Sequence, residues 1–541
     1  MGFLCAWPER GWLDGLRWNP LRERPLLHLV LWGIAWALAA GAIFLWLQKP
    51  VQYGHYKSCA GPAHDVLLGK SLLHDTPSIY GYFSVHAYAV LMRELGHSMG
   101  GFHLSNILLH VLYYLLGGMV LSRLLKDWRL VVPMFFVLLC LQTLFSNNNY
   151  ALFPSSGAMR FLPGMVMSAC LVFLQWRAAF PVGAILAAIS VFWSAEVGAF
   201  VLPAWLVVCL SRAWLEADSW QGALRRTRSY SVRTLAACGG VLALVLLSEY
   251  RPGVGLPHLS RLYEYVLAYR AVTDAPRIPA FGNWYMLAAL HVFAFVVFAH
   301  AAYRRLDSDF LAVLGFSCLY NVLAFSYYVA ESYPNYVVNL TVPALLEGAA
   351  IVRVLRESFG ISRHRIAAWL LAPAVVFCLL FFHRCQARFP AKALDACTDA
   401  RENFAMWTAP EPAHALLDEL CARFGEEPVI LLSRPTDTAR LLAAKRRNAL
   451  PLNPLSMAFE LPHWKERYVL PALEKVEPGT LVLCDMPAMG VVMDEVEKRF
   501  MLQHLGHVRD HKVPEGQLPP GQTVRLDIYR VTGRKPEAQS R

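Results

Sequence analysis

The chain has 541 residues, of which 56% are hydrophobic and only 16% are charged, and its mean hydropathy is +0.38. These values exclude an ordinary soluble globular protein and are typical of a protein that lies in a lipid bilayer. The net charge of +11 does not indicate a nucleic-acid partner, because the basic residues form short clusters between apolar runs instead of one basic stripe.

Apolar runs long enough to cross about 30 Å of hydrocarbon, roughly 17 to 25 residues each, occur about eleven times along the chain. They lie at 27–47, 102–122, 129–146, 161–176, 179–194, 196–212, 233–250, 283–303, 309–330, 335–355 and 365–383. The pattern predicts an α-helical polytopic membrane protein with about eleven transmembrane helices.

Lys and Arg residues concentrate in every second connecting segment, for example at Arg24, Arg226 and Arg305. Because cytoplasmic segments of membrane proteins carry an excess of basic residues, we expect the N-terminus inside the cell and the loop after the first span outside it. A signal peptide cleaved near the small residues 37–42 is the alternative. It is disfavoured because the apolar run is long for a signal peptide and further spans follow.

The composition changes after residue 384, where charged residues and prolines separate short apolar stretches. The patterns at 428–433, 480–486 and 523–531 predict strands, and those at 412–424, 435–446 and 490–505 predict helices. We therefore expect a membrane domain, 1–384, with an active site at its outer face, and an extracytoplasmic α/β domain, 385–541, whose tail after Thr532 is disordered. The second domain contains no GxGxxG, P-loop, CxxC or HExxH motif, which favours a supporting or acceptor-binding role.

Polar and ionisable residues gather at the outer ends of the predicted spans, beginning with GPAHDVLLGKSLLHDTPSIYGYF at 61–83. Such residues are costly at a membrane, so they usually line a cavity or a substrate pathway. The middles of the spans are poor in acids, with Glu347 as the main exception. The candidates are Lys57, His64, Asp65, Lys70, Asp75 and Tyr80 in the first outer loop, Arg160 and Glu196 in later ones, and Tyr333 and Asn335 in ESYPNYVVN.

A carboxylate beside basic groups at the outer membrane face fits one reaction class, the attack of an acceptor hydroxyl on a sugar carried by a membrane lipid phosphate. An aspartate in the stretch 61–83 is the predicted base that takes the proton of the hydroxyl. Arg160, Lys57 and Lys70 are predicted to stabilise the departing phosphate, and the remaining candidates to bind substrate. A direct displacement inverts the sugar's anomeric configuration. Because the donor is a phosphodiester with a single negative charge, we expect neither a cofactor nor an obligatory divalent metal.

The order of one crossing, an outer loop with an acid, a short surface helix at 83–95 and a return at 102 resembles the C-type superfamily of integral-membrane glycosyltransferases. FPSSGAMRFLPG (153–164) and FWSAEVGAF (192–200) look like the second and third outer motifs of its bacterial members. The resemblance covers residues 27–383. It implies a polyprenyl-phosphate-linked sugar as donor and a catalytic acid in the first outer loop, which corresponds to Asp65, with Asp75 as the second choice. The chain departs from the family at Glu331, near which many relatives have an arginine.

The resemblance extends to bacterial arabinofuranosyl- and mannosyltransferases and to enzymes that decorate pilins or O-antigen. It therefore implies a location in the bacterial inner membrane, with the C-terminal domain in the periplasm, and an acceptor that is an envelope glycan, O-antigen or pilin. The sugar, an arabinofuranose or a hexose, is not specified by these residues.

Each candidate also has a purely structural interpretation. Asp65 is suited to cap a helix that starts at Val66, and Asp75 before Thr76 and Pro77 is suited to a turn. Arg160 is placed to extend its charge to the membrane interface, and Glu196 to lie in a loop. The segment 258–272, HLSRLYEYVLAYRAV, is interpreted as an interfacial helix in contact with lipid.

Two other classes of function remain open on the sequence. A lipid or sugar transporter, or flippase, also has many spans, but it is expected to show discontinuous helices, polar sites at the membrane midplane and an internal repeat. A non-catalytic scaffold of the cell envelope explains the outer domain but not the acids, amides and bases at the outer ends of the spans.

Overall fold

The structure is a computed structural model that describes residues 34, 53–78, 80–125, 131, 157–264, 284–306, 310–330, 339–360, 428–432, 448–450, 465–484, 486–510 and 524–536. The chain forms two compact units. The helical unit comprises Met1–Leu47, Ile107–Val245 and Ala275–Thr398, and the mixed unit comprises Gln48–Asn106, Leu246–Asp274 and Asp399–Arg541. The predicted domain boundary at 384 lies outside the described residues and stays a prediction.

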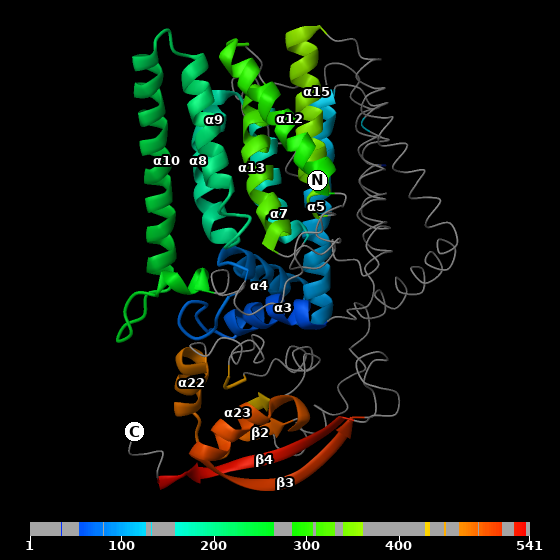
Figure 1. The fold of residues 1–541 in the computed structure, drawn as a ribbon. Coiled ribbons are helices and arrows are strands. Elements are labelled where there is room, and N and C mark those ends of the chain that lie inside the picture. Colours follow the sequence, from blue (N-terminus) through cyan, green and yellow to red (C-terminus); the bar gives the residue numbers. More distant parts are fainter. Residues whose placement is uncertain are drawn as a thin grey trace, which may run out of the picture. The chain divides into compact units, whose positions relative to one another are not determined.

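The helical unit is built from long apolar helices that lie side by side (Figure 1). They are α5 (Met99–Leu125), α7 (Ala158–Phe173), α8 (Trp176–Trp193), α9 (Val201–Leu215), α10 (Trp220–Ser248), α12 (Trp284–Tyr303), α13 (Leu311–Ala330) and α15 (Thr341–Phe359). Each corresponds to one of the predicted spans. The predicted spans at 27–47, 129–146 and 365–383 lie outside the described residues, apart from Ile34 and Val131 within them.

Among the described residues, four helical segments are long and apolar enough to cross a membrane: Gly100–Leu125, Trp176–Trp193, Trp220–Ser248 and Trp284–Tyr303. Met159–Phe173, Val201–Leu215 and Leu311–Ser326 are apolar but shorter. A mostly helical membrane fold is therefore confirmed, and the number of about eleven spans stays a prediction.

The core of the helical unit forms around α13, which packs against α7, α9, α12 and α15. Small residues permit this close packing. A Cβ atom at Gly164 of α7 would lie 2.4 Å from Cζ of Tyr320 on α13, so only glycine lets these two helices approach. In the absence of a hydrophobic driving force between helices in lipid, such close contacts hold the bundle together.

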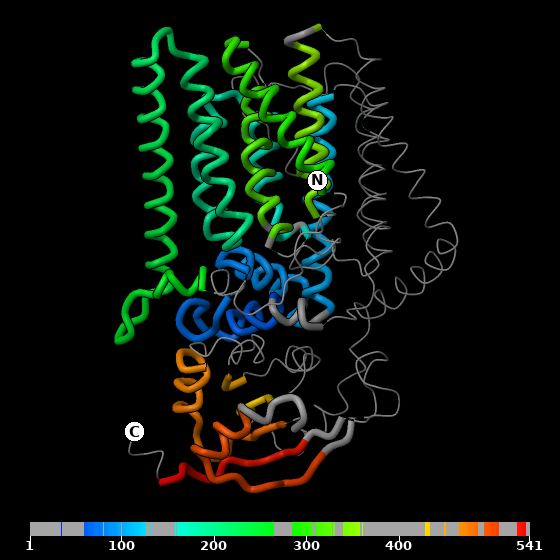
Figure 2. The backbone as a smooth tube through the Cα atoms, viewed as in Figure 1, coloured from blue at the N-terminus to red at the C-terminus, as the bar shows by residue number. Residues whose placement is uncertain are grey.

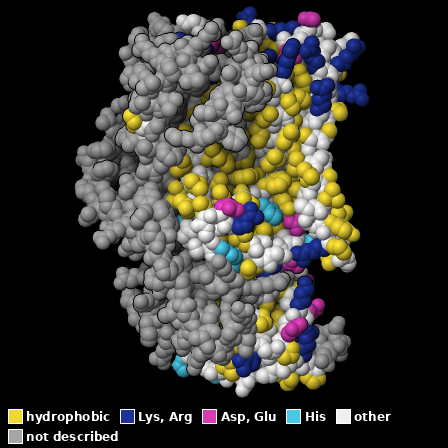
Figure 3. Space-filling model, turned by 180° about the vertical axis from the view of Figure 1, so that it is seen from behind, with side chains coloured by type: hydrophobic (Ala, Val, Ile, Leu, Met, Phe, Trp, Pro, Cys, Tyr) yellow, Lys and Arg dark blue, Asp and Glu magenta, His cyan; other side chains and the backbone are white. Residues whose placement is uncertain are grey.

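Short connections make successive helices antiparallel, as the backbone trace shows (Figure 2). Two residues separate α7 from α8, and four separate α9 from α10. Lys and Arg side chains gather at one end of the helical unit, and hydrophobic side chains cover its visible flank (Figure 3). This separation agrees with the charge asymmetry of the sequence, because the basic ends of α9, α10 and α12 are those predicted to face the cytoplasm.

The mixed unit contains two short helices near its N-terminal boundary, α3 (Tyr53–Leu67) and α4 (Phe83–Leu95), which pack against each other. The predicted surface helix at 83–95 is confirmed with the same bounds. The helix predicted to start at Val66 is wrong, because α3 ends at Leu67 and Asp65 lies in its last turn. Asp65 therefore does not cap the start of a helix.

The C-terminal part of the mixed unit holds a four-stranded sheet in the order β1-β2-β4-β3. Its strands are β1 (Val429–Leu432), β2 (Leu481–Cys484), β3 (Phe500–Asp510) and β4 (Val524–Arg534). β1 and β2 are parallel and the other pairs are antiparallel. The helix α23 (Met486–Arg499) packs against β1, β3 and β4, and a short helical turn, η6 (Lys465–Val469) and α22 (Leu470–Glu474), precedes β2.

Three of these strands were predicted and the fourth was not. The helix predicted at 490–505 is wrong after Arg499, where β3 begins, because the following residues pair along β4. The tail also begins later than predicted, since β4 extends to Arg534. The predicted helices at 412–424 and 435–446 lie outside the described residues.

Candidate active site

Asp65 and Lys70 form an ion pair at the end of α3, with 2.8 Å between Lys70 Nζ and Asp65 Oδ1. Two backbone hydrogen bonds close this end of the helix: Lys70 N–H donates to Asp65 O at 2.9 Å, and Gly69 N–H donates to Val66 O at 3.0 Å. Gly69 has a φ of +83°. This is the glycine-terminated helix end in which the chain turns back over the last turn, and it places Lys70 beside Asp65.

The ion pair is buried. Asp65 is 0% exposed and Lys70 is 6% exposed, and Lys70 Nζ also donates to the carbonyl of Leu450 at 3.1 Å. A carboxylate near the C-terminal end of a helix is disfavoured by the helix dipole, and the ammonium group of Lys70 offsets that cost. The pair thus brings together a proton acceptor and a positive charge, the two functions predicted for Asp65 and Lys70.

Asp75 closes the loop that follows Lys70. Its Oδ2 accepts a hydrogen bond from Ser71 N–H at 2.9 Å and pairs with Arg251 Nη1 at 2.7 Å. The turn predicted here is present, since Asp75 N–H donates to Ser71 O at 2.9 Å. The carboxylate of Asp75 is therefore engaged by the loop itself and by one arginine.

The other predicted residues of the first outer loop are His64, Tyr80 and Lys57. His64 is buried, and its Nδ1 lies 2.6 Å from His97 Nε2. Tyr80 is buried as well, and its carbonyl accepts a hydrogen bond from Ser84 Oγ at 3.3 Å. Lys57 lies in α3, but its side chain is outside the described part of the structure, as are Tyr333 and Asn335 entirely. Their predicted roles stay predictions.

Glu249 was not predicted from the sequence and lies near the same loop. It is 7% exposed, accepts a hydrogen bond from Ser71 Oγ and has His86 Nε2 at 3.6 Å from its Oε1. Burial raises the pKa of Glu249, but the interactions with His86, Ser71 and Tyr82 outweigh burial and hold the pKa below its usual value. Burial also raises the pKa of Tyr82 to about 12. The contacts with Ser71, His86 and Tyr82 thus favour the carboxylate form of Glu249.

In the helical unit, the structure brings Arg160 and Glu196 together as an ion pair. Arg160 lies in the first turn of α7, and Glu196 lies in the tight turn between α8 and α9. That turn requires a glycine, because a Cβ atom at Gly198 would lie 2.3 Å from the carbonyl oxygen of Ser190. Arg160 is 7% exposed, so its charge is directed to Glu196 and not into the lipid interface.

A second polar cluster lies inside the helical unit and joins three helices. Nδ1 of His291 on α12 lies 2.6 Å from Glu347 Oε2 on α15, and Nδ2 of Asn321 on α13 donates to the same oxygen at 3.1 Å. All three residues are buried. Glu347 was visible in the sequence as an acid within a span, but its two partners were not.

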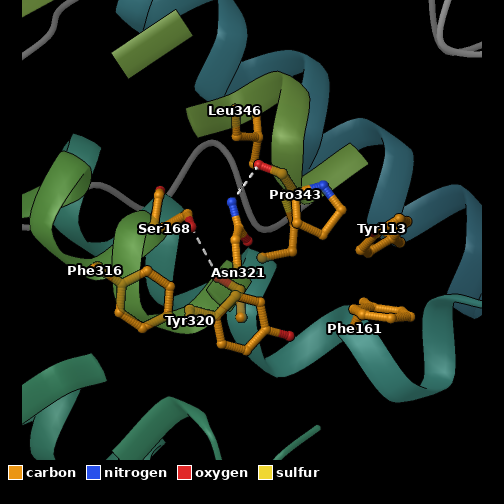
Figure 4. Close-up of a pocket in the computed structure, with 11 residues that line it drawn as sticks. Tyr113, Phe161, Ser168, Phe316, Tyr320, Asn321, Pro343 and Leu346 are labelled. Carbon is orange, nitrogen blue, oxygen red and sulfur yellow. Dashed lines mark hydrogen bonds between the residues drawn. The ribbon is translucent and has the colours of Figure 1, made fainter. Parts of the chain in front are cut away.

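Asn321 also lines a narrow cavity between α5, α7, α13 and α15. Aromatic side chains, among them Tyr113, Phe161 and Tyr320, surround it (Figure 4). The amide of Asn321 donates to the carbonyl of Pro343 at 3.0 Å on one side of this cavity. Its lining includes none of the residues that the sequence analysis assigned to the active site.

Among the described residues, no group of three or more His, Cys, Asp or Glu side chains could hold a metal ion. The described residues include two ion pairs among the predicted site residues: Asp65 with Lys70 in the mixed unit, and Arg160 with Glu196 in the helical unit.

Comparison with known proteins found similarity in structure only. No family model and no curated protein matches the chain. Its structural neighbours are structures of ArnT. ArnT from Cupriavidus metallidurans bound to undecaprenyl phosphate aligns over 94% of this chain and 97% of its own length, with 13% identity and a TM-score of 0.48. The apo state of the same ArnT aligns over 94% and 98%, with 13% identity and a TM-score of 0.46. Because these TM-scores are below 0.5, we infer the function from the residues of the chain itself.

Sequence reasoning missed Glu249, Arg251 and Arg261. Glu249 stood at the end of an apolar run, where it was taken as part of the predicted span 233–250. Arg261 was assigned to an interfacial helix at 258–272, but the described part of that segment is the short 3-10 helix η4 (Leu259–Leu262) and a turn. Arg261 donates to the carbonyls of Leu73 and His74. No local signal reveals these contacts, because the hydrogen-bonded partners lie 178 to 188 residues apart.

Proposed function

We propose that this protein is a glycosyltransferase that moves a sugar from a polyprenyl-phosphate donor to an extracytoplasmic acceptor such as an envelope glycan, O-antigen or pilin. The observation that carries the proposal is the buried pair of Asp65 and Lys70, 2.8 Å apart, in the loop motif that resembles the C-type superfamily. Undecaprenyl phosphate, the ligand of one ArnT structure, belongs to the same class of lipid phosphate.

The reaction is a single displacement at the anomeric carbon of the donor sugar. The oxygen of an acceptor hydroxyl forms the new bond, and the bond between that carbon and the phosphate oxygen breaks, with the electron pair leaving on the lipid phosphate. Asp65 takes the proton of the hydroxyl. Lys70 supplies positive charge to the departing phosphate. Because attack comes from the face opposite the phosphate, the anomeric configuration is inverted.

The pair is suited to this task because its two charges are held together before substrate binds. Lys70 keeps Asp65 in a defined position, and the anionic phosphate can take over the ammonium group as the donor enters. Asp65 is then released from its counter-charge, and its carboxylate can accept the proton of the acceptor hydroxyl. Lys70 should therefore pair with the carboxylate of Asp65 when no donor is bound, and with the phosphate when the donor is bound.

The test is transfer by the purified full-length protein carrying Asp65→Asn. We expect a loss of turnover of about 10²-fold or more, because the amide keeps the size of the side chain but cannot take a proton. Asp218→Asn, at an exposed position, is the matched control and should transfer at the wild-type rate. Because Asp65→Asn leaves Lys70 buried without its counter-charge, retained binding of the donor lipid phosphate serves as the check of folding.

Transfer by Asp65→Asn at the wild-type rate would show that the base is another residue, with Asp75 and Glu196 as the next candidates. Loss of activity in EDTA, with recovery in Mg²⁺ or Mn²⁺, would overturn the expectation of metal-free transfer. The acceptor is identified by mass analysis of envelope glycans and pilin from cells with and without the chain.

One observation favours the alternative function of a lipid or sugar transporter. The cluster of His291, Asn321 and Glu347 places ionisable groups inside the helical unit, where they usually mark a pathway. Proteoliposomes decide between the two functions. Movement of a lipid-linked sugar across the bilayer without formation of a glycosidic bond supports the transporter, and bond formation supports the transferase.

A further inference from the structure

The segment after α10 contributes three charged side chains to the loop 69–75, and all of these residues belong to the mixed unit. Glu249 accepts the hydrogen bond of Ser71 Oγ. Arg251 pairs with Asp75, and its Nη2 lies 3.4 Å from the carbonyl oxygen of Gly69. Arg261 Nη1 donates to the carbonyls of Leu73 at 2.6 Å and His74 at 3.2 Å. We call these three residues the clamp.

The clamp adds side-chain partners to a loop whose backbone also forms hydrogen bonds within the loop itself. Leu72 and Leu73 are 0% and 1% exposed, so the loop is drawn into the unit and its polar groups need partners there. The clamp supplies partners for three of its carbonyls. Hydrogen bonds to charged groups are the stronger ones, so the loop is held in one arrangement.

The position of Lys70 depends on that arrangement. Gly69 and Ser71 are its chain neighbours, and the clamp holds the carbonyl of the first and the hydroxyl of the second. The ammonium group of Lys70 reaches Asp65 and Leu450 only if its backbone stays in place. A shift of about 1 Å in such a supporting element can cost around 10²-fold in rate.

We propose that Glu249 and Arg251 are positioning residues for Asp65 and Lys70, and that the segment 249–261 is therefore part of the active site although it touches neither reacting group. This inference rests on the proposed function of Asp65 and Lys70. Glu249 acts through Ser71, and Arg251 acts through Asp75 and Gly69.

The decisive experiment is a double-mutant cycle between Glu249 and Ser71 in the purified full-length protein. We expect Glu249→Ala to lower kcat/KM for the polyprenyl-phosphate sugar by about 10- to 100-fold. Glu249→Gln, which keeps an oxygen that accepts from Ser71 Oγ, should retain most of the activity. Ser71→Ala should reproduce the loss, and the double variant Ser71→Ala with Glu249→Ala should be little worse than either single variant.

Glu264→Ala is the matched control, because Glu264 lies in the same segment but pairs with Arg467. It should leave transfer unchanged, and all variants should unfold at the same temperature as the wild type to within a few degrees. If the losses of Glu249→Ala and Ser71→Ala multiply in the double variant, Glu249 does not act through Ser71 and the proposal is overturned.

Amide hydrogen exchange tests the clamp without any assay of sugar transfer. The amide of Ser71 donates to Asp75, and those of Asp75 and Thr76 donate to the carbonyl of Ser71. Glu249→Ala should speed exchange at these amides about tenfold while the amides of β2 stay protected. Unchanged exchange in the loop would overturn the clamp. Faster exchange in a protein that transfers no sugar would retain the clamp and reject the proposed function instead.

Discussion

At residue 69 the backbone adopts a φ of +83°, a conformation that costs a residue with a side chain about 1–2 kcal/mol. Glycine avoids this cost, and the turn it permits places Lys70 beside Asp65 through the hydrogen bond from Lys70 N–H to Asp65 O. A single glycine thus connects the local conformation of the chain to the geometry of the ion pair.

Gly69→Ala should therefore destabilise the protein by about 1–2 kcal/mol and lower transfer, because the turn that carries Lys70 is strained. There is open space around the position of the added Cβ, so the effect is one of backbone conformation and not of a clash. Gly240→Ala, an exposed position with open space in the middle of α10, is the control and should be neutral or stabilising. Thermal unfolding in detergent measures both variants, and equal unfolding temperatures would contradict the explanation.

Variants of Arg160 and Glu196 are expected to change the affinity for the donor lipid phosphate in opposite directions. If Arg160 binds the donor phosphate, Arg160→Ala should weaken binding of the lipid phosphate by about 1.5–3 kcal/mol. Glu196→Gln should strengthen it, because the phosphate no longer competes with a carboxylate for the guanidinium group. Titration of the lipid phosphate measures both. If the pair only braces the turn between α8 and α9, neither variant will change this affinity.

At the scale of elements, α12, α13 and α15 are joined by the contacts of His291, Asn321 and Glu347. His291 Nδ1 and Asn321 Nδ2 share Oε2 of Glu347 inside an apolar bundle, where an unpaired polar group is costly. The helices therefore hold each other by polar contacts in their interior, in addition to the packing around α13.

Glu347→Leu should destabilise the helical unit by about 1–3 kcal/mol, because it leaves the donors on His291 and Asn321 without their acceptor. The double variant His291→Leu with Glu347→Leu should be less destabilised than the sum of its single variants, since it removes both partners together. Unfolding in detergent gives the coupling energy. Strict additivity would mean that His291 and Glu347 do not interact.

At the scale of the whole molecule, the distribution of charge along the helix α10 predicts the orientation of the chain in the membrane. It has 29 residues and is about 43 Å long at 1.5 Å per residue, more than the roughly 30 Å of the hydrocarbon core. Its first part carries exposed arginines, among them Arg225 and Arg228, and its last part is apolar. The basic part is therefore expected at the cytoplasmic surface.

Cysteine labelling of right-side-out membrane vesicles tests this orientation. A membrane-impermeant maleimide should label Val254→Cys, beyond the end of α10, in closed vesicles. It should label Arg228→Cys only after the vesicles are opened, with the unsubstituted chain as background. The reverse pattern would place the loop 61–83 in the cytoplasm, where a periplasmic transfer reaction cannot occur.

The sequence by itself determined the membrane-spanning character, the short helix at 83–95 and three of the four strands. These features depend on composition and on periodicity within one segment, which are local properties. The sequence pattern of a segment predicted the wrong secondary structure where the pattern fits two kinds of secondary structure. Gly61 and Pro62 disfavour a helix in the sequence, although Pro62 is an internal residue of α3. The apolar residues directly after Arg499 favour a continuation of the helix α23, although they form the start of β3.

Only the tertiary structure decided which polar groups meet. Asp65 and Lys70 were both candidates, but their pairing depends on a turn at Gly69 that follows an unpredicted helix. Arg160 and Glu196 were also both candidates, and they pair because a tight turn carries Glu196 to the first turn of α7. Glu249, Arg251 and Arg261 were not candidates, because their hydrogen-bonded partners in the loop 69–75 lie 178 to 188 residues away in sequence. Contacts over that separation follow from the folding of the mixed unit as a whole, and no periodicity within a segment encodes them.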